Sequence, residues 1–243
     1  MLGIVDIHSH IIPDVDDGAR TLEESKQMLE IAYSEGIRTI IATPHFRHEV
    51  FECSMDKIEE QYQAVKQLGQ SIGEGIAIRL GCEYYAEICM TDKLKNEPKY
   101  TMAGTSYVLI EFSVDVEFSC MRAIIQELVR GGYKPILAHA ERYECLYKRF
   151  YAKELITLGA KMQLNADSII GENGRKVKKF CKKIMKKNLL EFIGTDGHDT
   201  KVRRPSIIKC VNYLEKKMGC DYAKKILIDN PQKIIDEISQ EYK

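Results

Sequence analysis

Short apolar segments alternate with longer amphipathic segments along nearly the whole sequence, and this alternation limits the fold more than any other feature. The apolar segments span residues 2–7, 37–43, 76–83, 107–112, 134–140, 161–166 and 189–196. The amphipathic segments span residues 21–36, 55–72, 118–132, 150–160, 174–188 and 204–239. Strands that are apolar throughout are typical of a parallel sheet covered on both faces. The pattern therefore predicts an α/β fold of about seven strand–helix units with parallel strands, most simply a barrel.

The composition favours one domain that spans residues 1–243. The chain has 243 residues, of which 44% are hydrophobic, and it contains no linker-like or low-complexity stretch. This is enough for one large core. Lysine plus arginine and aspartate plus glutamate both number 36. The resulting net charge of zero gives no support to a nucleic-acid or membrane-surface partner.

Cysteine use and the amino-terminal residues predict a cytoplasmic protein. None of the 8 cysteines forms a C-x-x-C pair, which argues against a zinc ribbon or a redox motif. The first residues lack the basic region of a signal peptide, and Asp6 and His8 interrupt their apolar run. No stretch of about 18 consecutive apolar residues is present to span a membrane. We therefore expect a protein of the cytoplasm with free thiols.

Ionisable residues are concentrated where the predicted strands end. These residues are His8, His10, His45, Glu83, Glu111, His139, Asp196 and His198. Among the 6 histidines of the chain, only His48 lies outside this set. In a parallel barrel the carboxyl ends of all strands open onto one face, which is where such folds place their sites. We therefore expect side chains from distant parts of the sequence to meet at that face.

The residue types in this set favour a metal centre. The imidazoles of His8 and His10 point to the same side, because strand side chains alternate. Histidines mixed with carboxylates suit zinc, manganese or iron(II), and more than four candidate ligands imply more than one ion. A centre with several metal ions can activate water for attack on phosphorus. A purely structural set of polar residues is the alternative interpretation.

Six motifs in the chain resemble one known family. They are DIHSHIIPDVDDG (6–18), TPH (43–45), GCEYY (81–85), LIEFS (109–113), AHAERY (138–143) and GTDGHDTKVRRP (194–205). The sequence resembles the polymerase-and-histidinol-phosphatase (PHP) superfamily, and within it the bacterial manganese-dependent protein-tyrosine phosphatases of capsular and exopolysaccharide synthesis. The resemblance covers nearly the whole chain. It implies a distorted TIM-like (β/α)7 barrel with a metal site at the carboxyl-terminal face of the parallel strands.

The resemblance also implies three metal ions, commonly Mn²⁺, with iron, zinc or magnesium as alternatives. The implied ligands are His8, His10, Glu83 and Asp196 for the first ion, Glu83 (bridging), Glu111 and His139 for the second, and Asp17, His45 and His198 for the third. Two further acids in the first motif match no ligand position. We expect Asp14 to be a loop residue and Asp16 to support a turn or a ligand.

Arginines near these motifs are candidates for phosphate binding, because the guanidinium fork matches phosphate oxygens. Arg142 and one of the adjacent residues Arg203 and Arg204 match the arginines that bind phosphate in the family. The spacing from Asp196 favours Arg204. Asp196 and His198 are also candidates for protonating the leaving group, if the metals leave them free.

The reaction that the resemblance implies is hydrolysis of phosphotyrosine by a metal-activated hydroxide. The tyrosine phenolate, with a solution pKa of about 10, leaves more readily than an alkoxide, so a strong general acid is less necessary. We expect no cysteine nucleophile, because no cysteine has the C-x5-R spacing of thiol phosphatases. The implied substrate is a phosphotyrosine protein, in particular a bacterial tyrosine kinase. A homo-oligomer is an open alternative to a monomer.

Two basic features lie outside this assignment. Arg47 closely follows His45 and is a weaker candidate for phosphate binding. Residues 175–187 combine many lysines with an apolar stripe, which is typical of an outer barrel helix with a solvated face. A docking face for an acidic partner or an anionic membrane is the alternative for this helix.

Two other functions are compatible with the same set of ligands. A histidinol-phosphate phosphatase, or another phosphoesterase of the superfamily, would differ only in the residues around the site. A nucleic-acid-associated domain, like the one attached to bacterial replicative polymerases, comes from a different class. The zero net charge and the complete ligand set argue against it.

Overall fold

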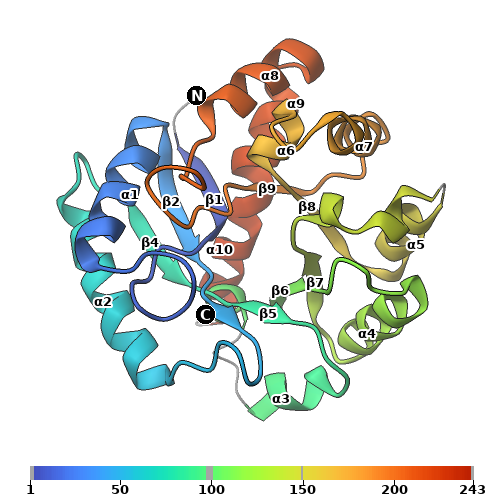
Figure 1. Cartoon of the computed structure of the whole chain (residues 1–243), viewed down its shortest axis with the longest axis horizontal. Coiled ribbons are helices and arrows are strands. Elements are labelled where there is room, and N and C mark those ends of the chain that lie inside the picture. Colours follow the sequence, from blue (N-terminus) through green and yellow to red (C-terminus); the bar gives the residue numbers. More distant parts are fainter. Residues whose placement is uncertain (1–2, 97–100, 149, 242–243) are drawn as a thin grey trace.

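Parallel strands alternate with helices in the structure, a computed structural model that describes residues 3–96, 101–148 and 150–241 (Figure 1). The strands are β1 (Ile4–Ser9), β2 (Ile37–Ala42), β3 (His45–Phe46), β4 (Ala77–Leu80), β5 (Glu83–Tyr85), β6 (Tyr107–Glu111), β7 (Lys134–Leu137), β8 (Lys161–Asn165) and β9 (Phe192–Gly194). The α-helices are α1 (Leu22–Ser34), α2 (Met55–Ser71), α3 (Met90–Asn96), α4 (Phe118–Arg130), α5 (Tyr151–Leu158), α6 (Ala166–Ile170), α7 (Arg175–Lys186), α8 (Ile208–Met218), α9 (Cys220–Lys224) and α10 (Asn230–Glu241). Short 3-10 helices occur at Met102–Gly104, Ala140–Arg142 and Glu144–Tyr147, and a π-helical turn at Lys225–Asp229.

Within the described residues the strands form two hydrogen-bonded groups, β1-β2-β4 and β3-β5-β6-β7-β8-β9, with parallel pairing throughout. β3 and β5 continue β2 and β4 after short breaks. Pro44 lies in the first break and has no N–H to give to the ladder. The N–H groups of Gly81 and Glu83 donate to Ala42 O and Pro44 O at 2.7 and 3.0 Å, which keeps the two bent strands side by side. The two hydrogen-bonded groups therefore form one continuous series of neighbouring strands.

β9 returns to β1 and closes the ring of strands. The N–H groups of Asp196 and His10 donate to His8 O and Gly197 O, both at 2.8 Å. A parallel bridge also joins Ser9 with Gly197. Figure 1 shows helices around the strands, with α10 across the middle of the view. The predicted distorted (β/α)7 barrel is confirmed, and its distortion lies in the two broken strands and in this short seam.

Both faces of the strands are buried, which explains why the strand sequences are apolar throughout. Val108 and Ile110 of β6 belong to the large core that also includes the outer helices. Leu109 of the same strand packs in a smaller cluster with Ile136 of β7 and Ile234 of α10. Successive side chains of one strand thus enter different cores, and polar side chains are left for the carboxyl ends.

The elements differ from the sequence-based prediction mainly where strands end. The segment 76–83 is two short strands with a break, and the strands expected at 134–140 and 189–196 stop early, at the ends of β7 and β9. His139 and Asp196 have φ values of +31° and +53°, which a strand cannot contain. The chain therefore leaves the sheet where these polar side chains begin. The short helices α3 and α6 are not predicted by the pattern.

Candidate metal centre

The carboxyl ends of the strands gather polar side chains in one place. All nine predicted ligands are there: His8, His10, Asp17, His45, Glu83, Glu111, His139, Asp196 and His198. Among the described residues they form three overlapping groups, each with ligand atoms within 4.8 Å of one another, and His139 joins them through Glu83. The expected convergence of distant segments is confirmed. Their service as metal ligands stays a prediction.

The first group, made of His8, His10, Glu83 and Asp196, is fully enclosed. His8 Nε2 and His10 Nε2 lie 3.0 and 3.2 Å from Glu83 Oε2. Both nitrogens also lie 3.5 Å from Asp196 Oδ1. The side chains are at most 3% exposed. Two imidazole nitrogens and two carboxylates thus converge on one point, an arrangement that suits a divalent transition-metal ion.

Glu83 connects the first group to a second one. Its other oxygen, Oε1, lies 2.8 Å from His139 Nε2, which is 3.8 Å from Glu111 Oε2. His45 Nδ1 lies 3.2 Å from both Glu83 Oε2 and Glu111 Oε1. Glu83 therefore presents one oxygen to each side, as a bridging carboxylate would. His45 adds a nitrogen that the family resemblance does not assign to this group.

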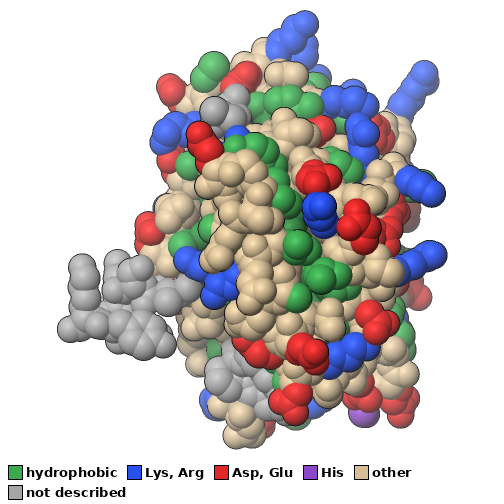
Figure 2. All heavy atoms as spheres, turned by 90° about the vertical axis from the view of Figure 1, so that its left-hand side faces the viewer, with side chains coloured by type: hydrophobic (Ala, Val, Ile, Leu, Met, Phe, Trp, Pro, Cys, Tyr) green, Lys and Arg blue, Asp and Glu red, His purple; other side chains and the backbone are tan. Residues whose placement is uncertain are grey.

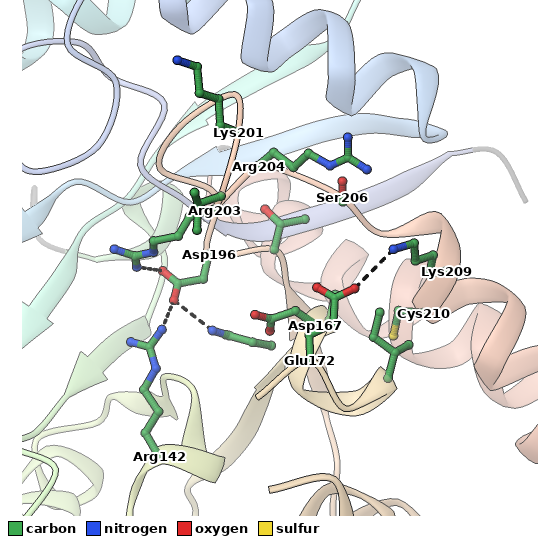
Figure 3. A pocket seen from close by; sticks show the side chains of 15 residues that line it. Arg142, Asp167, Glu172, Asp196, Lys201, Arg203, Arg204, Ser206, Lys209 and Cys210 are labelled. Atoms are coloured by element: carbon green, nitrogen blue, oxygen red, sulfur yellow. Dashed lines mark hydrogen bonds and ion pairs between the residues drawn. The ribbon is translucent and has the colours of Figure 1, made fainter. Parts of the chain in front are cut away.

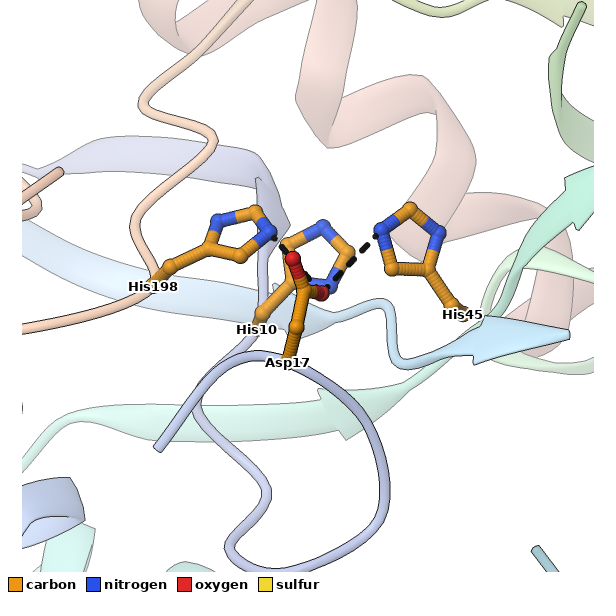
Figure 4. Close-up of side chains that lie close together, drawn as sticks. All are labelled: His10, Asp17, His45 and His198. Carbon is orange, nitrogen blue, oxygen red and sulfur yellow. Dashed lines mark ion pairs between the residues drawn. The ribbon is translucent and has the colours of Figure 1, made fainter. Parts of the chain in front are cut away.

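The third group lies at the mouth of the site. Asp17 Oδ1 is 3.5 Å from both His45 Nε2 and His198 Nε2 (Figure 4). His10 belongs here too, with its ring stacked on that of His198 at a centroid distance of 3.8 Å. The Asp17 side chain is 48% exposed and that of His45 is 12% exposed. This group is therefore the one that solvent reaches most easily.

Hydrogen bonds from outside the groups orient two of the histidines. His10 Nδ1 lies 2.8 Å from Asp16 Oδ2, and His198 Nδ1 lies 2.8 Å from the backbone oxygen of Asp196. These oxygens accept, so each ring carries its proton on Nδ1 and turns the lone pair of Nε2 towards the site. Asp16 Oδ2 also accepts the N–H of His45 at 2.9 Å. The expectation that Asp16 supports a turn or a ligand is confirmed.

The loop after β1 depends on Asp16 and Gly18. The N–H of Gly18 donates to Asp16 Oδ1 at 2.9 Å. A Cβ at position 18 would lie 2.2 Å from His10 O, so the loop can pass this close only with glycine. Asp14 is exposed and pairs with Lys57 at 2.8 Å, as expected for a loop residue.

Two of the predicted ligands, His139 and Asp196, have a left-handed backbone conformation. For residues other than glycine this costs on the order of 1–3 kcal/mol and persists only where the surroundings impose it. The N–H of His139 donates to Gln163 Oε1 at 2.7 Å, and the N–H of Asp196 donates to His8 O at 2.8 Å. These bonds hold both residues in the conformation that turns their side chains into the site.

The chemistry of the site fits cations. Despite close neighbours, the buried atoms Glu83 Oε2, His45 Nδ1 and His198 Nε2 form no hydrogen bond with any residue that the structure describes. Burial raises the pKa of Glu83, but the surrounding imidazoles, His8 first, hold it well below its usual value. Ionised carboxylates and free imidazole lone pairs are the forms that bind metal ions. The mixture of nitrogen and oxygen donors suits manganese, iron or zinc.

Two arginines reach the site from different loops. Arg142, in the 3-10 helix after β7, pairs with Asp196 Oδ2. Arg203, in the loop after β9, lies 3.2 Å from Asp196 Oδ1 (Figure 3). It also lies 3.6 Å from Asp17 Oδ2. Their side chains are 40% and 39% exposed, so both guanidinium groups remain accessible. This position allows them to bind the oxygens of a phosphoryl group.

Arg203 reaches the acids of the site, whereas the spacing argument favours Arg204; which of the two binds phosphate stays a prediction. Arg204 is exposed, and its guanidinium group points away from Asp196 in Figure 3. The cause is the local loop structure. The Asp199 carboxylate accepts the N–H of Arg203 at 3.2 Å, and the N–H of His198 donates to Arg203 O at 2.7 Å. This tight turn brings Arg203 to the acids, which spacing alone does not reveal.

A polar pocket extends from Asp196 between the β8 and β9 loops (Figure 3). Its lining includes Arg142, Asn165, Asp167, Arg203, Arg204 and Lys209. Cys210 also lines it, but burial raises the pKa of that thiol far above its usual value. A buried, protonated thiol is a poor nucleophile. This agrees with the expectation that cysteine takes no part in the chemistry.

The other basic features have ordinary structural surroundings. Phe180 and Ile184 of α7 are buried, so the helix packs through its apolar stripe and turns its basic face outwards, as expected. Arg47 stacks over the ring of Tyr85 at 4.2 Å. The face shown in Figure 2 carries acidic and basic side chains interspersed. In the described part of the chain, no helix has the length and apolar character needed to cross a membrane.

A parallel barrel with several histidine and carboxylate groups at its strand ends is typical of metal-dependent hydrolases. Comparison with known proteins narrows this class. The family model for capsular polysaccharide synthesis, CpsB/CapC, matches residues 4–236. The chain belongs to this CpsB/CapC family, and the resemblance found in its sequence motifs is confirmed.

Relatives and solved structures agree with this family. The chain is 33% identical over 240 residues to the tyrosine-protein phosphatase CpsB of Streptococcus pneumoniae, covering 96% of this chain and 98% of the relative. It is 32% identical over 224 residues to the tyrosine-protein phosphatase YwqE of Bacillus subtilis (strain 168), covering 90% and 86%. A solved structure from work on YwqE and CpsB, described as unique metal-dependent tyrosine phosphatases, matches with a TM-score of 0.85 and 26% identity, covering 97% and 94%. A Mycobacterium tuberculosis phosphotriesterase, at 11% identity and a TM-score of 0.62 over 97% and 94% of the two chains, shares the fold alone.

Sequence reasoning missed two polar residues beside the ligands, Gln163 and Asn165 of β8. Both are buried, and Asn165 Nδ2 donates to Asp196 Oδ2 at 2.9 Å. The available signal was their spacing: two amides at alternate positions of an otherwise apolar strand share one face. Buried amides need partners, so such a pair indicates a polar neighbour on that face.

Proposed function

We propose that this protein hydrolyses phosphotyrosine in proteins, in a metal-dependent reaction at the centre described above. The observation that carries the proposal is the cluster of nine imidazole and carboxylate side chains with Arg142 and Arg203 beside it. The names of the curated relatives, which are tyrosine-protein phosphatases, support the choice of substrate.

The proposed cofactor is a set of three divalent ions, Mn²⁺ in the first place, with iron, zinc or magnesium as alternatives. The ligands would be His8, His10, Glu83 and Asp196 for the first ion, Glu83, Glu111 and His139 for the second, and Asp17, His45 and His198 for the third. When bound, the ions would activate water and stabilise negative charge on the phosphoryl oxygens.

Arg142 and Arg203 are the proposed phosphate-binding residues. Each contacts a different oxygen of Asp196, which aligns the two guanidinium groups before a substrate arrives. Their remaining N–H donors can bind the equatorial oxygens of the phosphoryl group. Their positive charge would stabilise the negative charge on these oxygens in the transition state.

Asp196 is poorly suited to donate a proton to the leaving phenolate. Burial raises the pKa of its carboxyl group, but the neighbouring imidazoles and Arg142 hold it well below its usual value. An ionised carboxylate has no proton to give. We therefore assign Asp196 to metal binding and to alignment of the arginines, and propose that the phenolate leaves without a strong general acid.

The proposed physiological substrate is a phosphotyrosine protein, in particular a bacterial tyrosine kinase that regulates capsular or exopolysaccharide synthesis. The family description, capsular polysaccharide synthesis, supports this process, and the kinase is what the resemblance of the sequence motifs implies. The protein would act as one domain over residues 1–243, in the cytoplasm and without a nucleic-acid partner.

Phosphate release from a phosphotyrosine peptide, with and without Mn²⁺, tests this function. We expect Mn²⁺-stimulated release from the native protein and its loss in His139→Ala. His48→Ala is the matched control, because that side chain is 63% exposed and pairs with Glu52, away from the ligand set. Activity on histidinol phosphate alone would move the function to histidinol-phosphate phosphatase with the same site. No metal-dependent release from either substrate would reject the proposal.

A further inference from the structure

Two buried amides on β8 connect three of the proposed ligands. Gln163 and Asn165 are 0% and 2% exposed. Gln163 Oε1 lies 2.7 Å from the backbone nitrogen of His139 and 3.2 Å from His8 Nδ1. Gln163 Nε2 donates to Asn165 Oδ1 at 2.9 Å, and Asn165 Nδ2 donates to Asp196 Oδ2 at 2.9 Å. This amide chain, Gln163 and Asn165, therefore runs from His8 and His139 to Asp196.

The direction of each hydrogen bond in the amide chain is fixed from both ends. A backbone N–H only donates, so the Gln163 atom that faces His139 must be the amide oxygen. Asp196 is a carboxylate paired with two arginines, so the Asn165 atom that faces it must be the amide nitrogen. Between the two residues, the Gln163 nitrogen then meets the Asn165 oxygen without conflict. His8 Nδ1 faces an oxygen already fixed as an acceptor, so it must carry the ring proton.

In the neutral imidazole, a proton on Nδ1 leaves the lone pair of His8 on Nε2. That atom lies 3.0 Å from Glu83 Oε2 and 3.5 Å from Asp196 Oδ1, inside the first ligand group. We infer that Gln163 and Asn165 are positioning residues that hold His8 in its metal-binding tautomer and hold Asp196 beside it. The inference deepens the proposed metal-dependent function and rests on it.

The acceptor for His8 differs in kind from the one for His10. Asp16, which faces His10 Nδ1, is a carboxylate, whereas Gln163 is a neutral amide. The ring of His8 is already close to Glu83 and Asp196, so a third carboxylate there would add repulsion between buried charges. A neutral amide fixes the same tautomer without that charge.

Gly194 of β9 leaves the room that the amide chain needs. A Cβ at this position would lie 2.6 Å from His8 Cβ and 3.1 Å from Gln163 Nε2. Its backbone is not left-handed, so space is the reason for glycine here. A larger residue would push His8 away from Gln163. The geometry of the first group therefore depends on close contact between β1, β8 and β9.

The tautomer of His8 in metal-free protein, read by NMR of ¹⁵N-labelled imidazole at a pH where the spectrum shows a neutral ring, tests the inference without relying on catalysis. We expect the Nδ1–H form in the native protein. Gln163→Met keeps the side-chain length but has no acceptor, so we expect a mixture of tautomers and about 10- to 100-fold weaker Mn²⁺ binding. Gln163→Glu retains acceptor oxygens and should retain the Nδ1–H form. Gln67→Met, at an exposed position of α2, is the matched control and should change neither property.

Asn165→Leu separates the two amides and is the second variant if Gln163→Met fails to fold. It removes the donor to Asp196 but leaves the oxygen that faces His8. We therefore expect the native tautomer with weaker Mn²⁺ binding, measured from the electron paramagnetic resonance signal of free Mn²⁺.

Four results would count against these assignments, each in a different way. An unchanged tautomer and unchanged Mn²⁺ affinity in Gln163→Met would overturn the inference. Loss of the Nδ1–H form in Gln163→Glu as complete as in Gln163→Met would also overturn it, because the acceptor oxygen would then not be the cause. Native Mn²⁺ affinity in Asn165→Leu would remove Asn165 from the proposal. A native protein that binds no Mn²⁺ would refute the proposed function instead.

Discussion

The enclosed part and the open part of the candidate metal centre use the same kinds of side chain in different surroundings. The enclosed part is the first group, His8, His10, Glu83 and Asp196. The open part consists of the three candidate ligands with the most exposed side chains, Asp17, His45 and Glu111, whereas His139 and His198 are only 3% and 2% exposed. Side chains of the enclosed part are at most 3% exposed, whereas those of the open part are 48%, 12% and 17% exposed. The enclosed imidazoles also have fixed acceptors behind them, Gln163 and Asp16.

This difference indicates that the two parts contribute in different ways. Burial strengthens each electrostatic interaction of the enclosed part and removes the alternative of hydration. Its geometry is therefore set before any ligand arrives. In the open part water competes for the same atoms, so ions and substrate can enter there at lower cost. Substitutions should consequently be most damaging in the enclosed part.

The largest effect should come from Glu83→Gln, because Glu83 faces His8 with one oxygen and His139 with the other. We expect kcat/KM for a phosphotyrosine peptide to fall at least about 1000-fold, since charge stabilisation by more than one ion is lost. The metal content of the purified variant should fall as well. A melting curve of each metal-free protein controls for folding. Activity within about tenfold of native would contradict the role of the enclosed part.

Arg203→Ala should have the next largest effect, because Arg203 lies beside both parts, near Asp196 and Asp17. We expect a loss of about 100-fold in kcat/KM, the scale for removing one preorganised donor to a developing charge. Arg204→Ala, one position away and exposed, is the matched control and should change kcat/KM by less than about twofold. A larger loss in Arg204→Ala than in Arg203→Ala would restore the argument from sequence spacing.

Asp17→Asn should have a smaller effect that excess metal reverses. We expect about tenfold lower activity at limiting Mn²⁺, because Asp17 belongs to the open part and its histidine neighbours remain. A titration of activity against Mn²⁺ should restore the rate. Asp196→Asn, from the enclosed part, should not recover in the same titration. Equal behaviour of the two variants would remove the distinction between the parts.

Thiol alkylation should have the smallest effect. Iodoacetamide should modify the exposed thiols of Cys89, Cys120 and Cys220 and change phosphatase activity by less than about twofold. Cys82 lies in the break between β4 and β5, next to Glu83. Burial raises the pKa of its thiol and makes it unreactive. Loss of activity with metal still bound would mean that a cysteine takes part in the reaction.

The convergence of the candidate ligands could be predicted from sequence because one rule of the fold brings them together. Strand ends of a parallel barrel share a face, so His8 and Asp196 could be brought together without knowing any side-chain contact. The choice between Arg203 and Arg204 could not be made, because it depends on how Asp199 folds the loop through its hydrogen bonds. Local contacts of this kind leave no periodic pattern in the sequence.

The amide chain could not be predicted from the sequence, for a different reason. Gln163 contacts His139 and His8, which are 24 and 155 positions away in the sequence. A single sequence gives the strand and its buried face but not the register between strands, which decides which side chains meet. The breaks in the barrel follow the same logic, since Pro44 is visible in the sequence but the hydrogen bonds that bridge its break are not.

The seam between β1 and β9 also affects how the chain folds and how well it resists proteolysis. The N–H of Thr195 donates to Asp6 Oδ1 across 189 positions of the chain. Closing a loop of that length costs on the order of 5 kcal/mol of entropy, so the seam is expected to form late in folding. His8 and Asp196 lie on opposite sides of it and meet only when it is shut. A bound ion therefore favours the shut barrel by mass action, and metal starvation would expose the seam to local opening and to proteases.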